Sequence, residues 1–384
     1  MRIALFSKVY APKIDGVVTR LHHTIQHLQQ QGDEVMVVCP HYGSPSASLA
    51  CLPNHLQYVP SIPLFCYPQL RLGCITATTW RKLNAFQPDV IHTLMPFTLG
   101  LGAAMYGRIR NIPLVASYHT DLLKCVKYYT IFTEKIAKLF VKNMHNMAQC
   151  NLVTSRAMMH QLKRLGVRQL QQWPAAVDTK LFHPRRYSSA MRQRLCRNPN
   201  KFVLLYVGRL AKEKHLEDLI TTLQHDARLH LAVVGTGPYA ATLRDRLPRN
   251  RTNFIGALHG QHLCAAYASA DLFVFPSPSE TLGLVVMEAM ASGLPVVAVA
   301  AGGVVELVDH NHTGLLVSHH HAAAQLCNAV VQLANHRSLR QRLRQTALQQ
   351  VGQYSWQHAT QVLRQHYRHT TAKFLQQNSR RYGV

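Results

Sequence analysis

The sequence stretch that most constrains the fold runs from residue 271 to residue 293 and reads DLFVFPSPSETLGLVVMEAMASG. Its apolar run, Leu272 to Phe275, stops at Pro276. A Pro/Ser turn follows, and then a segment of helix formers that ends at Ser292-Gly293. The stretch therefore predicts a buried strand, a tight loop and a helix, which is the unit from which α/β folds with parallel sheets are built.

Two carboxylates, Glu280 and Glu288, lie eight positions apart in this unit. At about 1.5 Å per helical residue they are at most ~12 Å apart, roughly the distance from the sugar to the ribose of a nucleotide diphospho-sugar. Between them, the N–H groups of Thr281, Leu282 and Gly283 would point outward at a positive helix end, which suits a phosphate. Glu280 would then accept hydrogen bonds from hexose hydroxyls and Glu288 from ribose hydroxyls. Taken singly, each has an ordinary alternative, Glu280 as a helix-start carboxylate and Glu288 as a solvated helix residue.

The Glu-x7-Glu spacing in SETLGLVVMEAMASGLPVVA resembles the donor-site motif of the retaining family 4 glycosyltransferases. That resemblance implies an α/β protein of two Rossmann-like parallel-sheet domains facing across a cleft, the GT-B fold, with a C-terminal helix that crosses back to the first domain. It also implies that Glu280 contacts the donor sugar and Glu288 the ribose. Neither a metal nor another cofactor is expected, and the chain contains no Asp-x-Asp metal-binding motif.

The length of the chain indicates two domains, because 384 residues with 47% hydrophobic side chains can bury two cores. We expect residues 1–185, joined by a C-terminal helix of about residues 352–384, to form the first domain, and residues 186–351 the donor-binding domain. No apolar run is long enough to span a bilayer, and the opening MRIALFSKVYAP is typical of a first strand and not of a signal peptide. The expectation is a cytoplasmic protein that lies on a membrane without crossing it.

In the first half, residues 3–7 predict a strand that leads into a loop and a helix, the opening of a Rossmann-like domain. Gly16 stands alone in that loop where a dinucleotide site would show G-x-G-x-x-G, so NAD is not expected. The resemblance implies that Gly16 lets the backbone approach donor and acceptor, and a turn glycine is the alternative. A later strand, residues 114–118, ends at His119, where parallel-sheet folds bind ligands. The resemblance gives His119 a contact with the donor sugar, and an incidental histidine among 24 is the alternative.

The second half restarts the pattern with a strand at residues 202–208, followed by the G-R-L-A-K-E-K block. Arg209 and Lys214 at this strand-to-helix turn are placed to neutralise a diphosphate, whereas a solvated basic loop is the alternative. The block is a second match to the family, which gives both residues the role of diphosphate ligands. The later turn at Gly235 and Gly237 permits close backbone approach to a ligand and is weaker evidence. The resemblance thus implies these catalytic residues: His119, Arg209, Lys214 and Glu280.

A net charge of +25 indicates an anionic partner, which can be nucleic acid, an anionic membrane or a phosphorylated substrate. Nucleic acid is not the expected partner, because the basic residues are dispersed and no RRM, KH or zinc-finger pattern occurs. Within residues 124–145, a helix from about Glu134 would carry an apolar stripe flanked by lysines, which is typical of helices on anionic bilayers. The alternative is an ordinary surface helix whose stripe faces the core. The residues concerned are Lys135, Ile136, Lys138, Phe140, Lys142 and Met144.

Three stretches most resemble the sulfoquinovosyl-diacylglycerol synthases of photosynthetic bacteria and plastids: MRIALFSKVYAPKIDGVVTRLHHTIQHLQQQGDEVMVV, NIPLVASYHTDL and WPAAVDTKLFHP. This resemblance implies transfer of sulfoquinovose from a UDP-sugar donor to a lipid acceptor, diacylglycerol, at an anionic membrane surface. Three alternatives stay open. In the first, the protein transfers glucose or mannose from UDP or GDP to a lipid or polyprenyl carrier. In the second, it epimerises a nucleotide sugar. In the third, which is of a different class, it binds nucleic acid.

Overall fold

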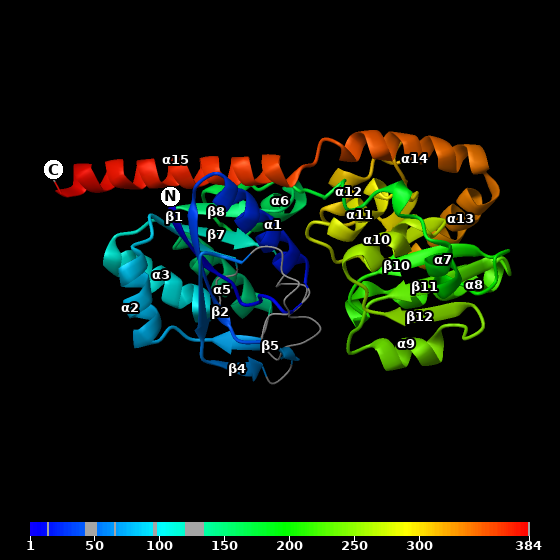
Figure 1. The fold of residues 1–384 in the computed structure, drawn as a ribbon, viewed down its shortest axis with the longest axis horizontal. Helices are drawn as coiled ribbons and strands as arrows, with labels where there is room; N and C mark the ends of the chain where they lie inside the picture. Colours follow the sequence, from blue (N-terminus) through cyan, green and yellow to red (C-terminus); the bar gives the residue numbers. More distant parts are fainter. Residues whose placement is uncertain (14, 43–51, 65–66, 95–97, 120–133, 383–384) are drawn as a thin grey trace. The chain divides into compact units, whose positions relative to one another are not determined.

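A computed structural model describes residues 1–13, 15–42, 52–64, 67–94, 98–119 and 134–382. The chain divides into two compact units, Met1–Pro174 with Trp356–Val384, and Ala175–Ser355 (Figure 1). The first unit therefore ends eleven residues before the expected boundary at 185/186. The reason is packing, because Val177 and Phe182 belong to the hydrophobic core of the second unit.

The first unit contains a seven-stranded parallel sheet in the order β3-β2-β1-β6-β7-β8-β9. Its central strand β1 sends alternate side chains to opposite faces, so that Ile3 and Leu5 join one core cluster while Ala4 and Phe6 join another. Both faces are therefore covered, as in other parallel sheets. The strands are β1 (Arg2–Phe6), β2 (Glu34–Pro40), β3 (His55–Val59), β6 (Val90–Thr93), β7 (Leu114–Tyr118), β8 (Cys150–Val153) and β9 (Leu170–Gln172), with an added hairpin of β4 (Ser61–Leu64) and β5 (Tyr67–Gly73).

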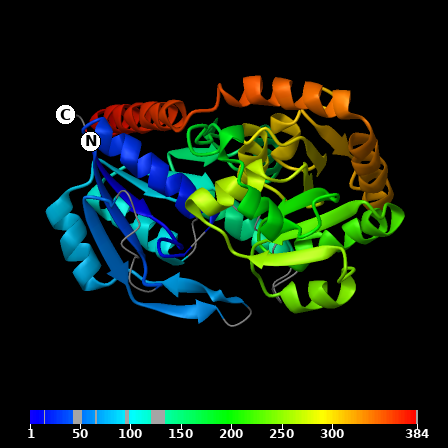
Figure 2. The ribbon, with the colours of Figure 1, turned by 45° about the vertical axis from the view of Figure 1, so that its right-hand side comes forward.

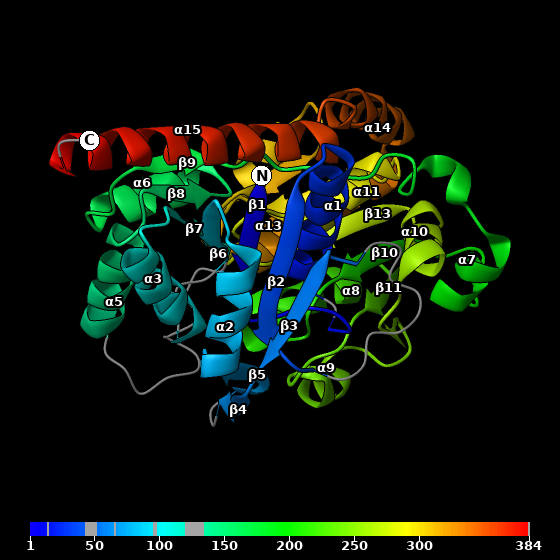
Figure 3. The same ribbon diagram turned by 60° about the vertical axis from the view of Figure 1, so that its left-hand side comes forward.

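Helices cover the two faces of this sheet. On one face, α1 (Gly16–Gln30) packs beside the long helix α15 (Trp356–Tyr382) (Figure 2). Arg364 of α15 pairs with Asp33 at 2.5 Å. The expected return of the C-terminal helix to the first unit is thus confirmed. The other face carries α2 (Ala77–Phe86), α3 (Thr98–Arg110), α5 (Glu134–Asn146) and α6 (Arg156–Arg164), and the first three stand together in Figure 3.

The second unit contains a six-stranded parallel sheet in the order β12-β11-β10-β13-β14-β15. The chain lays down β11 and β12 on one side of β10 and the later strands on the other, so the strand order reverses between β10 and β13. Ligands bind at such a reversal in open α/β sheets, beyond the carboxyl ends of the strands. The strands are β10 (Phe202–Val207), β11 (Leu229–Val234), β12 (Thr252–Gly256), β13 (Leu272–Phe275), β14 (Val296–Val299) and β15 (Leu315–Val317).

The helices of the second unit include the one that the opening stretch of the sequence predicts. β13 ends at Phe275, a loop follows, and α11 runs over Leu284–Ala291. The other helices are α7 (Ser189–Leu195), α8 (Leu219–His225), α9 (Ala240–Arg246), α10 (Gly260–Ala268), α12 (Val304–Leu307), α13 (Ala322–Asn335) and α14 (Arg337–Val351), with a short 3-10 turn at Lys212–Lys214. The predicted strand, loop and helix are therefore all present.

Candidate active site

Two loops meet where the strand order of the second unit reverses. The first follows β10 and carries Arg209 and Lys214, and the second follows β13 and carries Glu280. Because β10 and β13 are parallel neighbours, both loops leave the same edge of the sheet. Ser279 joins them directly, since its hydroxyl donates to the backbone carbonyl of Glu213 at 3.1 Å.

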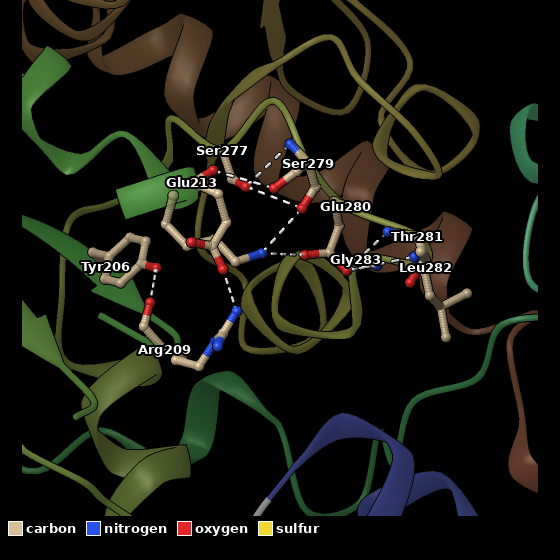
Figure 4. Close-up of polar contacts among 10 residues, drawn as sticks. Tyr206, Arg209, Glu213, Ser277, Ser279, Glu280, Thr281, Leu282 and Gly283 are labelled. Atoms are coloured by element: carbon tan, nitrogen blue, oxygen red, sulfur yellow. Dashed lines mark hydrogen bonds and ion pairs between the residues drawn. The ribbon is translucent and has the colours of Figure 1, made fainter. Parts of the chain in front are cut away.

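Lys214 and Glu280 form an ion pair between these loops, with Nζ and Oε2 3.1 Å apart. Figure 4 shows Glu280 between Ser279 and the backbone of Thr281 to Gly283. The ammonium also donates to the carbonyl oxygen of Ser279 at 3.1 Å. Burial by itself would raise the pKa of Glu280, but the positive charge of Lys214 and the N–H groups of Leu282 and Gly283 outweigh burial and lower it. Glu280 is therefore an ionised carboxylate.

The second carboxylate oxygen of Glu280 accepts hydrogen bonds from the backbone N–H groups for which the sequence predicts a phosphate ligand. Oε1 accepts from the backbone N–H of Thr281 at 3.2 Å, of Leu282 at 3.5 Å and of Gly283 at 3.2 Å. The turn is possible because Gly283 adopts φ +85°, which a side chain would strain. The expected cluster of donors is present, and the protein's own anion lies on it.

Arg209 forms an ion pair with Glu213, a residue that the sequence interpretation did not single out. The carboxylate of Glu213 is buried, with 5% of its side chain exposed, whereas 35% of the Arg209 side chain is exposed. The hydroxyl of Tyr206 donates to the backbone carbonyl of Arg209 at 3.1 Å. The backbone carbonyl of Arg209 is thus held by Tyr206, and its guanidinium is paired with Glu213. The signal for Glu213 was its place inside the G-R-L-A-K-E-K block.

Glu288 lies in α11, where the hydroxyl of Tyr267 on α10 donates to its Oε2 at 2.8 Å. Burial raises the pKa of Glu288 to about 7, against the opposing effect of the Tyr267 hydrogen bond. The alternative of a fully solvated helix residue is therefore wrong. The two glutamates of one motif differ, because Glu280 is ionised beside a lysine and Glu288 holds its proton more tightly than a free carboxyl.

The glycines after β11 serve packing between loops. A Cβ at Gly235 would lie 1.9 Å from the carbonyl oxygen of Gly208, and one at Gly237 would lie 2.2 Å from that of Leu210. The close approach expected at these positions is thus made by the loop that carries Arg209. Gly302 has the same relation to the loop after β13, because its Cβ would lie 1.6 Å from the carbonyl oxygen of Glu280.

His119 and Gly16 belong to the first unit. His119 follows β7 directly and is 8% exposed, and its Nε2 lies 2.8 Å from the hydroxyl of Ser117. Burial, reinforced by the nearby charge of Arg20, lowers the pKa of His119 well below its usual value. Gly16 is the first residue of α1, directly after the N-cap Asp15, whose side chain accepts from the N–H of Val17.

Helix α5 exposes the apolar side chains at residues 136 and 140 of the predicted stripe, together with Leu139. Ile136 is 54% exposed, Leu139 59% and Phe140 36%, while Ala137 and Val141 are buried. The alternative in which the stripe at residues 136 and 140 faces the core is therefore wrong. Lys138 pairs with Glu134 at 2.7 Å. The predicted residues before 134 lie outside the described part of the chain.

Comparison with known proteins identifies the family. The model of glycosyl transferases group 1 matches residues 188–350, and that of glycosyltransferase family 4 matches residues 14–181. The sulfoquinovosyl transferase SQD2 of Arabidopsis thaliana is 33% identical over 374 residues, covering 94% of this chain and 72% of the relative. The chain belongs to the family 4 glycosyltransferases of group 1. Arg209, Lys214, Glu280 and Glu288 thus lie in the group 1 half of a glycosyltransferase.

Further relatives of this glycosyltransferase differ in donor. A GDP-mannose-dependent alpha-mannosyltransferase of Mycobacterium tuberculosis is 33% identical over 371 residues, 96% of both chains. Among solved structures, Anabaena HepE in complex with UDP has a TM-score of 0.75 at 21% identity, covering 95% of this chain and 99% of that one. Sucrose-phosphate synthase of Thermosynechococcus elongatus has a TM-score of 0.77 at 22% identity, covering 97% and 99%. The structural matches confirm the GT-B fold.

None of the helices in the described part of this glycosyltransferase combines the length and apolar character that crossing a bilayer requires.

Proposed function

We propose that the protein is a retaining glycosyltransferase that moves a hexose from a nucleotide diphospho-sugar to a lipid hydroxyl. The observation that carries the proposal is the meeting of Lys214, Glu280 and the N–H groups of residues 281–283 where the sheet order reverses. A cation beside converging N–H groups suits a diphosphate leaving group. Arg209, on the same loop as Lys214, adds a second cation.

The diphosphate of the donor would compete with the Glu280 carboxylate for the same backbone N–H groups. A phosphate and a carboxylate cannot both accept from the same three N–H groups, and Lys214 now neutralises the carboxylate. We propose that the diphosphate takes the N–H groups and Lys214, and that Glu280 turns to accept from hydroxyls of the donor hexose. Glu288 would accept from the ribose. The ion pair between Lys214 and Glu280 would thus order the site before the donor binds, at the position that we propose for the diphosphate.

In the reaction, the bond between the anomeric carbon and the diphosphate oxygen breaks, and a bond from the acceptor oxygen to that carbon forms on the same face. The acceptor proton passes to the leaving phosphate oxygen, so the protein need not supply a general base. Arg209, Lys214 and the N–H groups of residues 281–283 stabilise the charge that develops on the diphosphate. His119 and Glu280 hold the hexose in orientation.

For the substrates, we propose UDP-sulfoquinovose as donor and diacylglycerol as acceptor, at a membrane surface. Three observations support this choice. The plant sulfoquinovosyl transferase is 33% identical over 94% of the chain. The net charge of +25 suits an anionic donor and an anionic membrane. Exposed apolar side chains and lysines share α5, as on helices that lie in the headgroup region.

A second candidate is transfer of mannose from GDP-mannose, or of glucose from UDP-glucose, to a lipid. The GDP-mannose-dependent relative is as similar as the sulfoquinovosyl transferase and matches 96% of both chains. A relative named alpha-monoglucosyldiacylglycerol synthase, from Acholeplasma laidlawii, is 27% identical over 322 residues.

A donor screen tests both candidates. UDP-sulfoquinovose, UDP-glucose and GDP-mannose are each incubated with the enzyme and diacylglycerol vesicles, and the lipid product is identified by mass. We expect sulfoquinovosyl-diacylglycerol from the first donor. Mannosyl or glucosyl lipid alone would select the second candidate. Free UDP without glycosylated lipid, or no reaction with any donor, would contradict lipid glycosylation.

A further inference from the structure

A chain of four buried polar side chains leads from His119 to the C-terminal helix. The hydroxyl of Tyr367 in α15 lies 2.6 Å from Nδ1 of His92, and Nε2 of His92 lies 2.9 Å from the hydroxyl of Ser117. That hydroxyl in turn lies 2.8 Å from Nε2 of His119. Tyr367 and His92 are 0% exposed and Ser117 is 1% exposed. The chain is therefore shielded from water from Tyr367 as far as Ser117.

The direction of these hydrogen bonds follows from what each group can donate. Within the described residues, the Tyr367 hydroxyl bonds His92 alone, so it must donate there or leave a buried proton unsatisfied. Nδ1 of His92 then accepts, which puts the proton of a neutral ring on Nε2. Nε2–H donates to Ser117, and Ser117 donates to Nε2 of His119. The proton of His119 is consequently on Nδ1.

Both histidines must be neutral for this chain to exist, because a doubly protonated ring donates from both nitrogens. Burial and the charge of Arg20 lower the pKa of His92 to about 3, and the same two causes lower that of His119. Arg20 is 1% exposed, its guanidinium lies 3.8 Å from the centre of the Trp173 ring, and it donates to the carbonyl oxygen of Trp173 at 3.0 Å. A buried cation therefore stands beside both imidazoles and keeps protons off them.

We propose that Tyr367 is a positioning residue that fixes His119 in its Nδ1–H tautomer, so that His119 meets the donor sugar as a hydrogen-bond donor and not as a base. The part of this inference that concerns the sugar rests on the proposed function. Nε2 of His119 has its lone pair engaged by Ser117, and Nδ1 already carries the proton. Neither nitrogen is left to take a proton from the acceptor.

The chain fixes a tautomer and does not conduct protons. If His119 lost its Nδ1 proton and the protons of Ser117, His92 and Tyr367 each shifted one place toward it, Tyr367 would become a phenolate at the far end. Burial raises the pKa of Tyr367 well above its usual value, so that state is strongly disfavoured. The arrangement therefore holds one orientation of every proton along its length, from the C-terminal helix to the carboxyl end of β7.

The test is Tyr367→Phe, which removes the hydroxyl and keeps the ring. Without that donor, His92 can place its proton on Nδ1, and the chain can reverse so that His119 carries its proton on Nε2. Tyr106→Phe is the matched control, because Tyr106 is also in the first unit, is 1% exposed and bonds Asn84 at 3.2 Å, outside the chain. Histidine is labelled with 15N, and long-range 1H–15N spectra identify the tautomer, with His119→Gln assigning the signal.

We expect the His119 signal to show Nδ1–H in the wild type and in Tyr106→Phe, and to shift toward Nε2–H in Tyr367→Phe. We also expect Tyr367→Phe to lower kcat by about tenfold, the effect of one misdirected hydrogen bond, with the KM for the donor little changed. An Nε2–H signal in the wild type, or equal kcat in the two Phe variants, would overturn the proposal. The spectra need no substrate, so they judge the chain even if no donor in the screen reacts.

Discussion

The loops after β10 and β13 in the second unit and the end of β7 in the first unit hold their polar groups in opposite ways. In the second unit, Lys214 and Glu280 are both charged and neutralise each other. At the end of β7, His119 is neutral and is held by a chain of uncharged hydrogen bonds. Paired charges can be exchanged for the charges of a diphosphate, whereas a neutral chain can only keep a group in one orientation. Under the proposed function, the paired charges of the second unit would stabilise the leaving diphosphate, whereas the neutral chain of the first unit would serve orientation alone.

The strongest test of this comparison is Lys214→Ala. Removing the ammonium takes one cation from the leaving diphosphate, and we expect kcat to fall by about 10³-fold. Lys212→Ala is the matched control, because Lys212 is exposed on the same 3-10 turn and should leave kcat unchanged. Circular dichroism and Tm establish that both variants fold. Normal turnover in Lys214→Ala would show that Lys214 does not stabilise the leaving diphosphate.

Glu280→Gln separates the two roles that we propose for this carboxylate. The variant cannot hold the donor hexose with a charged group, and we expect transfer to fall by about 100-fold. It also no longer competes as an anion for Lys214 and the N–H groups of residues 281–283, so UDP should bind several-fold more tightly. Calorimetric titration with UDP measures this.

Glu217→Gln makes the same change in net charge elsewhere in the second unit, where Glu217 pairs with Arg246 at 3.6 Å. It should leave both UDP affinity and transfer unchanged. Weaker UDP binding in Glu280→Gln would show that the carboxylate helps to hold the nucleotide and does not compete with it.

In the first unit, we expect the exposed lysines of α5 to bind an anionic membrane surface. Replacing Lys135, Lys138 and Lys142 of α5 by Gln should weaken binding to anionic vesicles about 100-fold, because each lysine near the surface contributes about 1 kcal/mol. UDP binding should not change. The control replaces Arg337, Arg342 and Arg344, which are exposed on α14 of the second unit. Equal losses in the two triple variants, measured by vesicle sedimentation, would reduce the effect to net charge.

Local sequence patterns predicted the fold and the loops of the second unit because the relevant residues are close in sequence. The strand, loop and helix at residues 271–293 and the block at residues 208–214 each lie within one unit of local structure. Parallel pairing of β10 and β13 then brings the two loops together. The contact of Lys214 with Glu280 therefore follows from topology and motif alone.

Such local patterns could not predict contacts between residues that are far apart in the sequence. Tyr367 and His92 are 275 positions apart, and nothing local to either indicates the other. The face that α5 buries is a related case. The apolar pattern left open whether residues 136 and 140 face a bilayer or the core, and the structure exposes both, while Ala137 and Val141 are buried and His145 of the same face lies 2.8 Å from Asn151. Packing of these small and polar side chains, which the apolar pattern does not indicate, decides which face of α5 is buried.

The smallest expected effect concerns Glu288, whose pKa is shifted upward, whereas that of Glu280 is shifted downward. The pKa of Glu288 is raised from 4.5 to about 7, so the folded protein binds this proton more tightly than the unfolded chain does. The stabilisation is therefore complete below about pH 4.5 and is lost as pH rises through 7. Glu288→Gln removes this pH dependence. We expect the Tm of the variant minus that of the wild type to increase by about 3 °C between pH 5 and pH 8.

Glu280→Gln is the matched comparison, because the pKa of Glu280 is shifted downward and its carboxylate is ionised throughout this pH range. Stability from a lowered pKa is lost only as pH falls through that pKa, so the Tm difference for Glu280→Gln should stay flat between pH 5 and pH 8. Parallel slopes in the two variants would mean that the motif's carboxylates share one environment. A slope for Glu288→Gln and none for Glu280→Gln would show that two carboxylates eight positions apart along one loop and helix have different environments.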